Sequence, residues 1–314
     1  MGINGLLFSF LGLWLLYRLL KRDFSPIVSV WVVLSVLFGT NLFHYTTKEM
    51  SIAHGYSFFL FVLLLYLLPN YLRHPGFRNS LILGAILGWI IVIRPTNAMV
   101  VLLLAGYDVY SWQDLKGRLI FFSQHICSLL WMSMAAIVIC IPQLMYWHEM
   151  TGHWIYYSYN REGFWYWNKP KIAAVLFDVQ NGLFLYSPLV LLMLIGVLYG
   201  IKLKKFHGPV LLLIFLIATY CFASWWTWWF GGAFGHRCYV EYYALLAIPL
   251  AGIYAKINSG RNRLLRYGFI SLTILLMIYS VRLSYLNTTL PGPWDGKDWR
   301  WNWEKYTWIM SHFF

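Results

Sequence analysis

Charged residues are scarce in this sequence, and acidic ones are the scarcest. Asp, Glu, Lys and Arg together make up 11% of the 314 residues, with 24 basic but only 11 acidic side chains. Soluble domains carry about 25% charged residues. Apolar residues here reach 60%. This balance is typical of a polytopic membrane protein and argues against a soluble core.

Cysteine is also rare, and its spacing excludes one kind of chemistry. The four residues Cys127, Cys140, Cys221 and Cys238 form no C-x-x-C pair, and none is paired with histidine in the pattern of a zinc site. We therefore predict no metal site from the cysteines. His148 and His153 leave a metal site open only as a minority alternative, since Glu149 is the one acid beside them.

Long apolar runs dominate what remains, and they lack the period of two that a β-barrel needs. Only helices and closed barrels satisfy the backbone in lipid, so we predict an all-α transmembrane bundle with short helices in its outer loops. About ten membrane helices are expected, at residues 4–20, 26–43, 56–72, 77–93, 97–112, 119–146, 186–201, 209–226, 240–255 and 267–284.

Basic residues gather in alternate short turns, which gives the bundle a predicted orientation. Fourteen of the 24 lie in five such turns, and the positive-inside rule places these in the cytoplasm. This distribution also argues against nucleic-acid binding. The bundle then covers 1–284, with outer loops at 44–55, 147–185 and 227–239, and an extracytoplasmic aromatic-rich tail at 285–314. Residue 1 would lie outside, which favours a chain that is the C-terminal part of a longer protein.

The outer segment from Ser224 to Glu241 concentrates unusual residues. It contains Trp229, His236 and Arg237 between two apolar runs. An arginine at membrane depth is costly unless an anionic or polar group receives it, and we predict a phosphate. Arg94, just before Pro95, lies on the same predicted face, so the two arginines could clamp one phosphate. The alternatives are an aromatic belt for the tryptophan and snorkelling for Arg94.

The predicted loop at 44–55 offers proton-transfer candidates. Lys48 and Glu49 are adjacent, and His54 follows. Glu49 or His54 could be a hydrogen-bonding or proton-transfer group at the mouth of a cavity, while a solvated turn is the alternative. The long segment from Trp147 to Ser187 is predicted to be a lid whose aromatic rings stack on a sugar or lie on lipid headgroups.

These motifs together resemble a known family. Gly39-Thr40-Asn41 followed by Ser51 and His54, the step Arg94-Pro95-Thr96, and the segment from Trp229 to Arg237 are similar to bacterial membrane glycosyltransferases of the GT-C superfamily, which includes protein O-mannosyltransferases and aminoarabinose transferases. The resemblance implies a polyprenyl-phosphate sugar donor, a lipid, glycan or protein acceptor, and inverting transfer outside the cytoplasm of a bacterial plasma membrane. A divalent cation is the one cofactor left open.

The departure from that family concerns the catalytic base. The family's catalytic aspartate lies in a first outer loop that this sequence lacks, so no catalytic residue carries over and Glu49 is only the nearest outer acid. The predicted substrate-binding residues are Arg94, Arg237, His236, His54, Lys48 and Trp229. Two alternatives remain: a non-catalytic remnant or subunit of such an enzyme, and a transporter or flippase of lipid-linked glycans.

Overall fold

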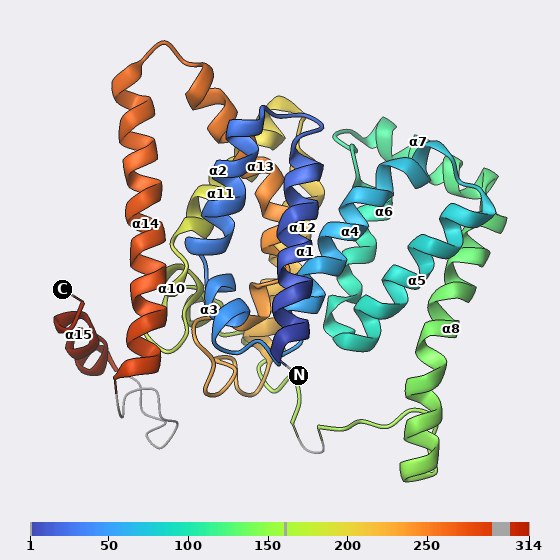
Figure 1. The fold of residues 1–314 in the computed structure, drawn as a ribbon. Helices are drawn as coiled ribbons and strands as arrows, with labels where there is room; N and C mark the ends of the chain where they lie inside the picture. Colours follow the sequence, from blue (N-terminus) through green and yellow to red (C-terminus); the bar gives the residue numbers. More distant parts are fainter. Residues whose placement is uncertain (1, 160–161, 291–301, 314) are drawn as a thin grey trace.

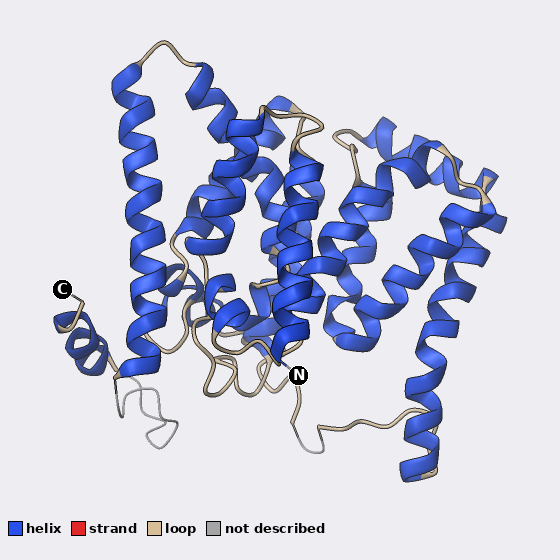
Figure 2. Ribbon diagram, in the orientation of Figure 1, coloured by secondary structure: helices blue, strands red, loops and turns tan. Residues whose placement is uncertain are grey.

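The computed structural model describes residues 2–159, 162–290 and 302–313, a part of the chain that contains helices and loops but no strand (Figures 1 and 2). The predicted all-α class is confirmed for these residues. The helices are α1 (Gly2–Leu20), α2 (Pro26–Phe38), α3 (Leu42–Thr47), α4 (His54–Arg73), α5 (Phe77–Ile93), the 3₁₀ helix η1 (Pro95–Val101), α6 (Leu102–Gly106), α7 (Trp112–Gln124), α8 (Ile126–Thr151), α9 (Ile172–Phe177), α10 (Leu183–Tyr186), α11 (Leu189–Leu203), α12 (Gly208–Ser224), the 3₁₀ helix η2 (Arg237–Tyr239), α13 (Tyr243–Ser259), α14 (Arg263–Thr289) and α15 (Trp303–Ser311).

Each predicted span contains helix, but the structure does not support ten membrane spans. Among the described residues, four helices are long and apolar enough to cross a bilayer, namely α1 from Ile3, α4, α8 and α14. Others are apolar but shorter, such as α2 with 13 residues. A helix of that length rises about 20 Å, less than the roughly 30 Å of a hydrocarbon core.

Two predicted spans are interrupted. Residues 97–112 hold the end of a 3₁₀ helix and the short α6, because Pro95 stops α5 and Asp108 turns the chain with φ 55°. Residues 119–146 belong to two helices that break at His125, where φ is −116° and ψ is 37°. The second break has no glycine or proline; its only sequence mark is the polar step Ser123-Gln124-His125 between two apolar runs.

Helix α13 occupies the centre of the bundle. Every residue from Tyr243 to Gly252 is buried, and the helix packs against α2, α4 and α11. A helix that is apolar on all sides is expected to be enclosed by others. By contrast, α8 and α14 lie at opposite edges in Figure 1 and expose large apolar side chains. The turn before α13 therefore lies at the middle of one end of the bundle.

The two ends of the bundle differ in chemistry. We call the end where α1 begins and α8 and α14 finish the lower end, as drawn in Figure 1. The turns between α1 and α2 and between α13 and α14, which carry two of the basic clusters, lie at the opposite end. This separation agrees with the predicted alternation of basic turns. Residues 291–301 and 314 of the predicted tail lie outside the described part of the chain. Helix α15, which follows, packs on α14, and the hydroxyls of Tyr306 and Tyr279 lie 2.7 Å apart.

Helix α8 is attached to the bundle mainly through α5. Gly84 and Gly88, four residues apart on one face of α5, lie against the backbone of Met132 and Ala136. A Cβ on Gly88 would lie 2.8 Å from the Ala136 carbonyl oxygen, and one on Gly84 would overlap that of Met132. Small residues at such a crossing let two membrane helices approach closely.

Replacing Gly84 by leucine should therefore separate α8 from α5. We expect Gly84→Leu to lower the free energy of unfolding by about 1–3 kcal/mol, the usual cost of overpacking. Thermal unfolding of the purified protein in detergent measures this. Gly117→Leu is the matched control, because a Cβ there meets nothing within 4 Å. Equal melting temperatures for the two variants would contradict the close crossing.

Candidate functional site

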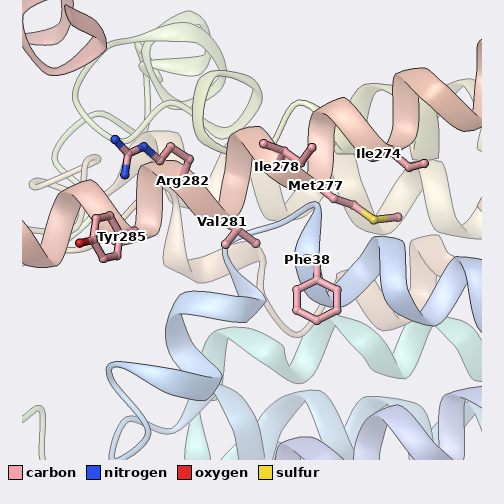
Figure 3. Close-up of a pocket in the computed structure, with 7 residues that line it drawn as sticks. All are labelled: Phe38, Ile274, Met277, Ile278, Val281, Arg282 and Tyr285. Carbon is pink, nitrogen blue, oxygen red and sulfur yellow. The ribbon is translucent and has the colours of Figure 1, made fainter. Parts of the chain in front are cut away.

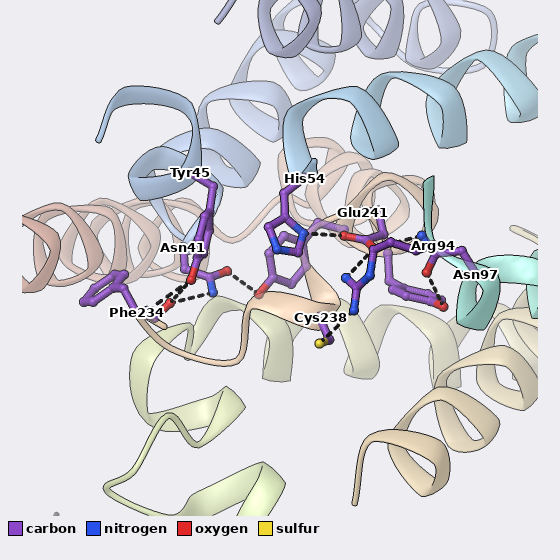
Figure 4. A network of polar contacts seen from close by, with 10 residues as sticks. Asn41, Tyr45, His54, Arg94, Asn97, Phe234, Cys238 and Glu241 are labelled. Carbon is purple, nitrogen blue, oxygen red and sulfur yellow. Dashed lines mark hydrogen bonds and ion pairs between the residues drawn. The ribbon is translucent and has the colours of Figure 1, made fainter. Parts of the chain in front are cut away.

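The centre of the lower end is the carboxylate of Glu241, whose side chain is 0% exposed. Its Oε1 accepts hydrogen bonds from Arg94 Nη1 and Asn97 Nδ2, both at 2.9 Å. Its Oε2 lies 3.0 Å from His54 Nδ1 (Figure 4). One buried carboxylate thus joins the start of α4, the start of η1 and the turn before α13.

Local sequence explains how these groups meet. Arg94 precedes Pro95, and a residue before proline is pushed into extended backbone. The backbone of Arg94 has φ −150° and ψ 106°, and this extended conformation ends α5 at Ile93. Pro95 then starts η1, which contains Asn97. Glu241 lies between η2 and α13, and His54 is the first residue of α4, so all four side chains come from element ends that meet here.

The carboxylate of Glu241 is held in its ionised form. Burial raises the pKa of this carboxyl, but the Arg94 charge and the hydrogen bonds from His54 and Asn97 outweigh burial and lower the pKa to about 2. Arg94 also donates from Nη2 to the Sγ of Cys238 at 3.0 Å. Since burial raises the pKa of the Cys238 thiol, Glu241 is the charged partner of Arg94.

Arg237 differs from Arg94 because its charge is not neutralised. It is half-buried, and in the described part of the chain no carboxylate forms an ion pair with it. Burial is the main influence on the pKa of both Cys238 and His236, and the charges of Arg94 and Arg237 each lower these pKa values. Arg237 is next to Cys238 in the chain, and Cys238 is hydrogen-bonded to Arg94, so the two predicted arginines come from segments that meet here. Glu241 balances the charge of Arg94 and does not form an ion pair with Arg237.

His236 is close to this cluster but is uncharged. The residue is 1% exposed, and its Nε2 lies 3.1 Å from the carbonyl oxygen of Trp228. Burial is the largest of the causes that lower the pKa of His236 to about 3. The neutral ring of His236 donates to the Trp228 carbonyl and so stabilises the loop at 225–240. It contributes no positive charge to the binding of an anion.

The remaining predicted residues lie outside the Glu241 network. Lys48 is exposed, and the Glu49 side chain is 34% exposed with its Oε1 3.8 Å from His44 Nε2. Trp229 is half-buried, and its carbonyl oxygen accepts a hydrogen bond of 2.8 Å from Asn181. The structure thus brings Arg94, His54, His236 and Arg237 together, and it does not join Lys48, Glu49 or Trp229 to them.

A second branch of hydrogen bonds fixes the loop at 225–240 to α3. Asn41 accepts from the Tyr243 hydroxyl at 2.7 Å and donates from Nδ2 to the Phe234 carbonyl at 3.1 Å. Tyr45 accepts from the Phe234 amide at 3.0 Å (Figure 4). Gly235 follows with φ 60°, and a Cβ there would lie 2.8 Å from Tyr186. A glycine is needed at this close, left-handed position.

Sequence reasoning missed Glu241 as a site residue, although one signal was available. Glu241 is the only acidic residue between Asp178 and Asp295, and it immediately precedes an apolar run. A lone carboxylate in that position requires a partner. Asn41, Asn97 and Cys238 gave no comparable signal, because short polar residues are common in loops.

The donor chemistry of the cluster does not resemble a metal site. Within the described ranges, no three side chains of His, Cys, Asp or Glu gather closely enough to hold an ion. A divalent cation, the one cofactor that the sequence left open, finds no set of three such ligands among the described residues.

The fold and the site define a class: an all-helical protein with bilayer-length helices and a buried, net positive polar cluster at one end of the bundle. No protein-family model, curated protein or solved structure matches the chain. Its function must therefore be argued from the site.

Removing the buried carboxylate tests the network. We expect Glu241→Ala to lower the free energy of unfolding by about 3–5 kcal/mol, because Arg94 is left buried without a counter-charge. Denaturant unfolding in detergent measures the change. The double variant Arg94→Met/Glu241→Leu should regain most of the loss, since no lone charge remains. A double variant less stable than Glu241→Ala would contradict the pairing.

Proposed function

We propose that this protein is a membrane glycosyltransferase, or the C-terminal part of one, that uses a polyprenyl-phosphate sugar donor at its lower end. The acceptor is a lipid, a glycan or a protein. The observation that supports this most directly is the unneutralised Arg237 beside the Arg94–Glu241 pair. A positive charge kept in a largely buried cluster favours an anionic ligand.

In this proposal the two arginines have different tasks. Arg94 is already engaged by Glu241 and Cys238, so it shapes the cluster and is not a free clamp. Arg237 would contact the phosphate and stabilise the negative charge that grows on it as the sugar leaves.

An apolar groove supports the binding of a lipid donor. It has a volume of about 580 Å³ and is lined by Phe38 of α2 and by Ile274, Met277, Ile278, Val281, Arg282 and Tyr285 of α14 (Figure 3). Arg282 lies toward the lower end and donates to the carbonyl oxygens of His312 and Phe313 at 2.9 and 2.8 Å. We propose that the isoprenoid chain lies here.

Contacts connect the groove with the cluster. Ser284, next to Tyr285 of the groove, lies 3.0 Å from His44 Nδ1 through its Oγ. The adjacent Tyr45 contacts His54, with the ring planes tilted by 59° and the centroids 4.9 Å apart. A lipid with its chain in the groove would carry its phosphate toward Arg237.

The proposed location is a bacterial plasma membrane, with the lower end outside the cytoplasm. The basic turns at the opposite end favour this orientation. We further propose that the shorter apolar helices cross the membrane together with the four long ones. The result is a multi-pass bundle of about ten helices, in which longer neighbours cover the ends of the shorter helices.

Arg237→Ala should abolish transfer while the protein still inserts and folds. We expect at least a 100-fold loss of turnover, the usual cost of removing a group that stabilises transition-state charge. The assay follows tritium from polyprenyl-phosphate [³H]mannose into the acceptor fraction, in membranes that contain the full-length protein. The same assay is repeated with labelled glucose and aminoarabinose donors.

Lys169→Ala is the control for this experiment, because Lys169 is an exposed cation in the outer segment 162–171. It should keep wild-type turnover. Unchanged turnover in Arg237→Ala would remove the phosphate role. Donor binding by the wild-type protein without any transfer would favour the non-catalytic or transport alternative.

Filling the groove should weaken donor binding. We expect Met277→Trp to raise the KM for the lipid donor about tenfold, with kcat nearly unchanged, because the ring occupies the space of the isoprenoid chain. Leu275→Trp is the matched control, since Leu275 is 62% exposed on the same helix and does not line the groove. Equal KM values for both variants would exclude the groove as the lipid site.

A further inference from the structure

The tautomer of His54 follows from its partner. Its Nδ1 lies 3.0 Å from Oε2 of Glu241, and an ionised carboxylate can only accept a hydrogen bond. Nδ1 therefore carries the hydrogen. In the neutral ring, Nε2 then holds a lone pair and is the basic nitrogen.

The basic nitrogen of His54 is left without a partner. None of the described residues forms a hydrogen bond with Nε2, and the side chain keeps a 4% exposed fraction. The ring contacts Tyr45. Burial is the main cause that lowers the pKa of His54, Glu241 opposes it, and the charges of Arg94 and Arg237 add to the lowering. His44 Nε2 and His236 Nδ1 also lack a hydrogen-bond partner, so what sets His54 apart is the carboxylate at its other nitrogen.

Other histidines at the lower end lack this arrangement. His44 uses Nδ1 for the Ser284 hydroxyl, and His236 uses Nε2 for the Trp228 carbonyl. Among the described histidines at this end of the bundle, only His54 lies within 3.0 Å of a carboxylate that is itself held by two further donors. A carboxylate that fixes the tautomer and orientation of an imidazole is the arrangement that makes histidine an effective general base.

We propose that His54 is the general base of the transfer reaction and that Glu241 is its positioning residue. This inference rests on the function proposed above. His54 Nε2 takes the proton of the acceptor hydroxyl, and the hydroxyl oxygen bonds to the anomeric carbon of the donor sugar. The bond from that carbon to the phosphate oxygen breaks, and the phosphate leaves with the electron pair and its negative charge beside Arg237.

This assignment replaces Glu49 as the candidate base. Glu49 lies outside the hydrogen-bond network, and its Oε1 is 3.8 Å from Nε2 of His44. Arg94 acquires an indirect role, because it keeps Glu241 ionised and so keeps the hydrogen on Nδ1 of His54.

The deciding variant is His54→Asn. An asparagine amide can donate to Glu241 from nearly the place of Nδ1, but it has no basic nitrogen. If His54 is the base, kcat for polyprenyl-phosphate [³H]mannose, or for whichever labelled donor the wild type uses, should fall by about 10²–10⁴-fold with the donor KM unchanged. If His54 only holds the structure, His54→Asn should transfer at the wild-type rate, and that result would overturn the proposal.

A second variant covers the case in which His54→Asn does not fold. In His54→Gly, added imidazole should restore at least a tenth of wild-type turnover, whereas it should restore none in Glu241→Gln. His207→Gln is the matched control, because His207 is buried but contacts neither the Glu241 network nor the groove, and this variant should keep its activity. Absence of rescue in a folded His54→Gly protein that still binds donor would contradict the base assignment. Absence of transfer by the wild type from every labelled donor would instead contradict the proposed function.

Discussion

The buried ion pair between Glu241 and Arg94 is the interaction on which the lower end of the molecule depends. A carboxylate with no exposed surface is tolerated in an apolar bundle only when donors surround it, and here Arg94, Asn97 and His54 supply them. His54 begins α4, Arg94 and Asn97 follow the end of α5, and Glu241 itself precedes α13. The hydrogen bonds to this one carboxylate therefore fix how α4, α5 and α13 meet. Glu241 also neutralises the charge of Arg94, whereas it does not pair with Arg237.

The position of this pair follows from the apolar character of α13. Because that helix is buried on all sides, the turn that precedes it is carried to the middle of the bundle end. Glu241 and Cys238 are in that turn, and the loop before it is fixed to Asn41 and Tyr45. Polar groups that are distant in the sequence thus meet at one point, although the bundle is otherwise held by apolar packing.

The sequence predicted the all-α class and named several residues of the candidate site, for physical reasons that also explain the misses. Apolar runs and scarce charge required helices, but run length did not reveal the break at His125, where the only mark is the short polar step Ser123-Gln124-His125. Arg94 and Arg237 were found because an arginine beside an apolar run is costly. The partner of Arg94 was not found, since periodicity carries no information on which distant carboxylate a guanidinium meets. The pairing of Glu241 with His54 is a tertiary contact across 187 residues.

The central claim is that Arg237, and not Arg94, is the free cation that binds a lipid phosphate. It is tested most directly by the ³¹P chemical shift of undecaprenyl phosphate titrated with the protein in nanodiscs. The account predicts a saturable shift with the wild-type protein and with the charge-neutral double variant Arg94→Met/Glu241→Leu, and none with Arg237→Ala. A shift that survives in Arg237→Ala and is lost in the double variant would contradict it.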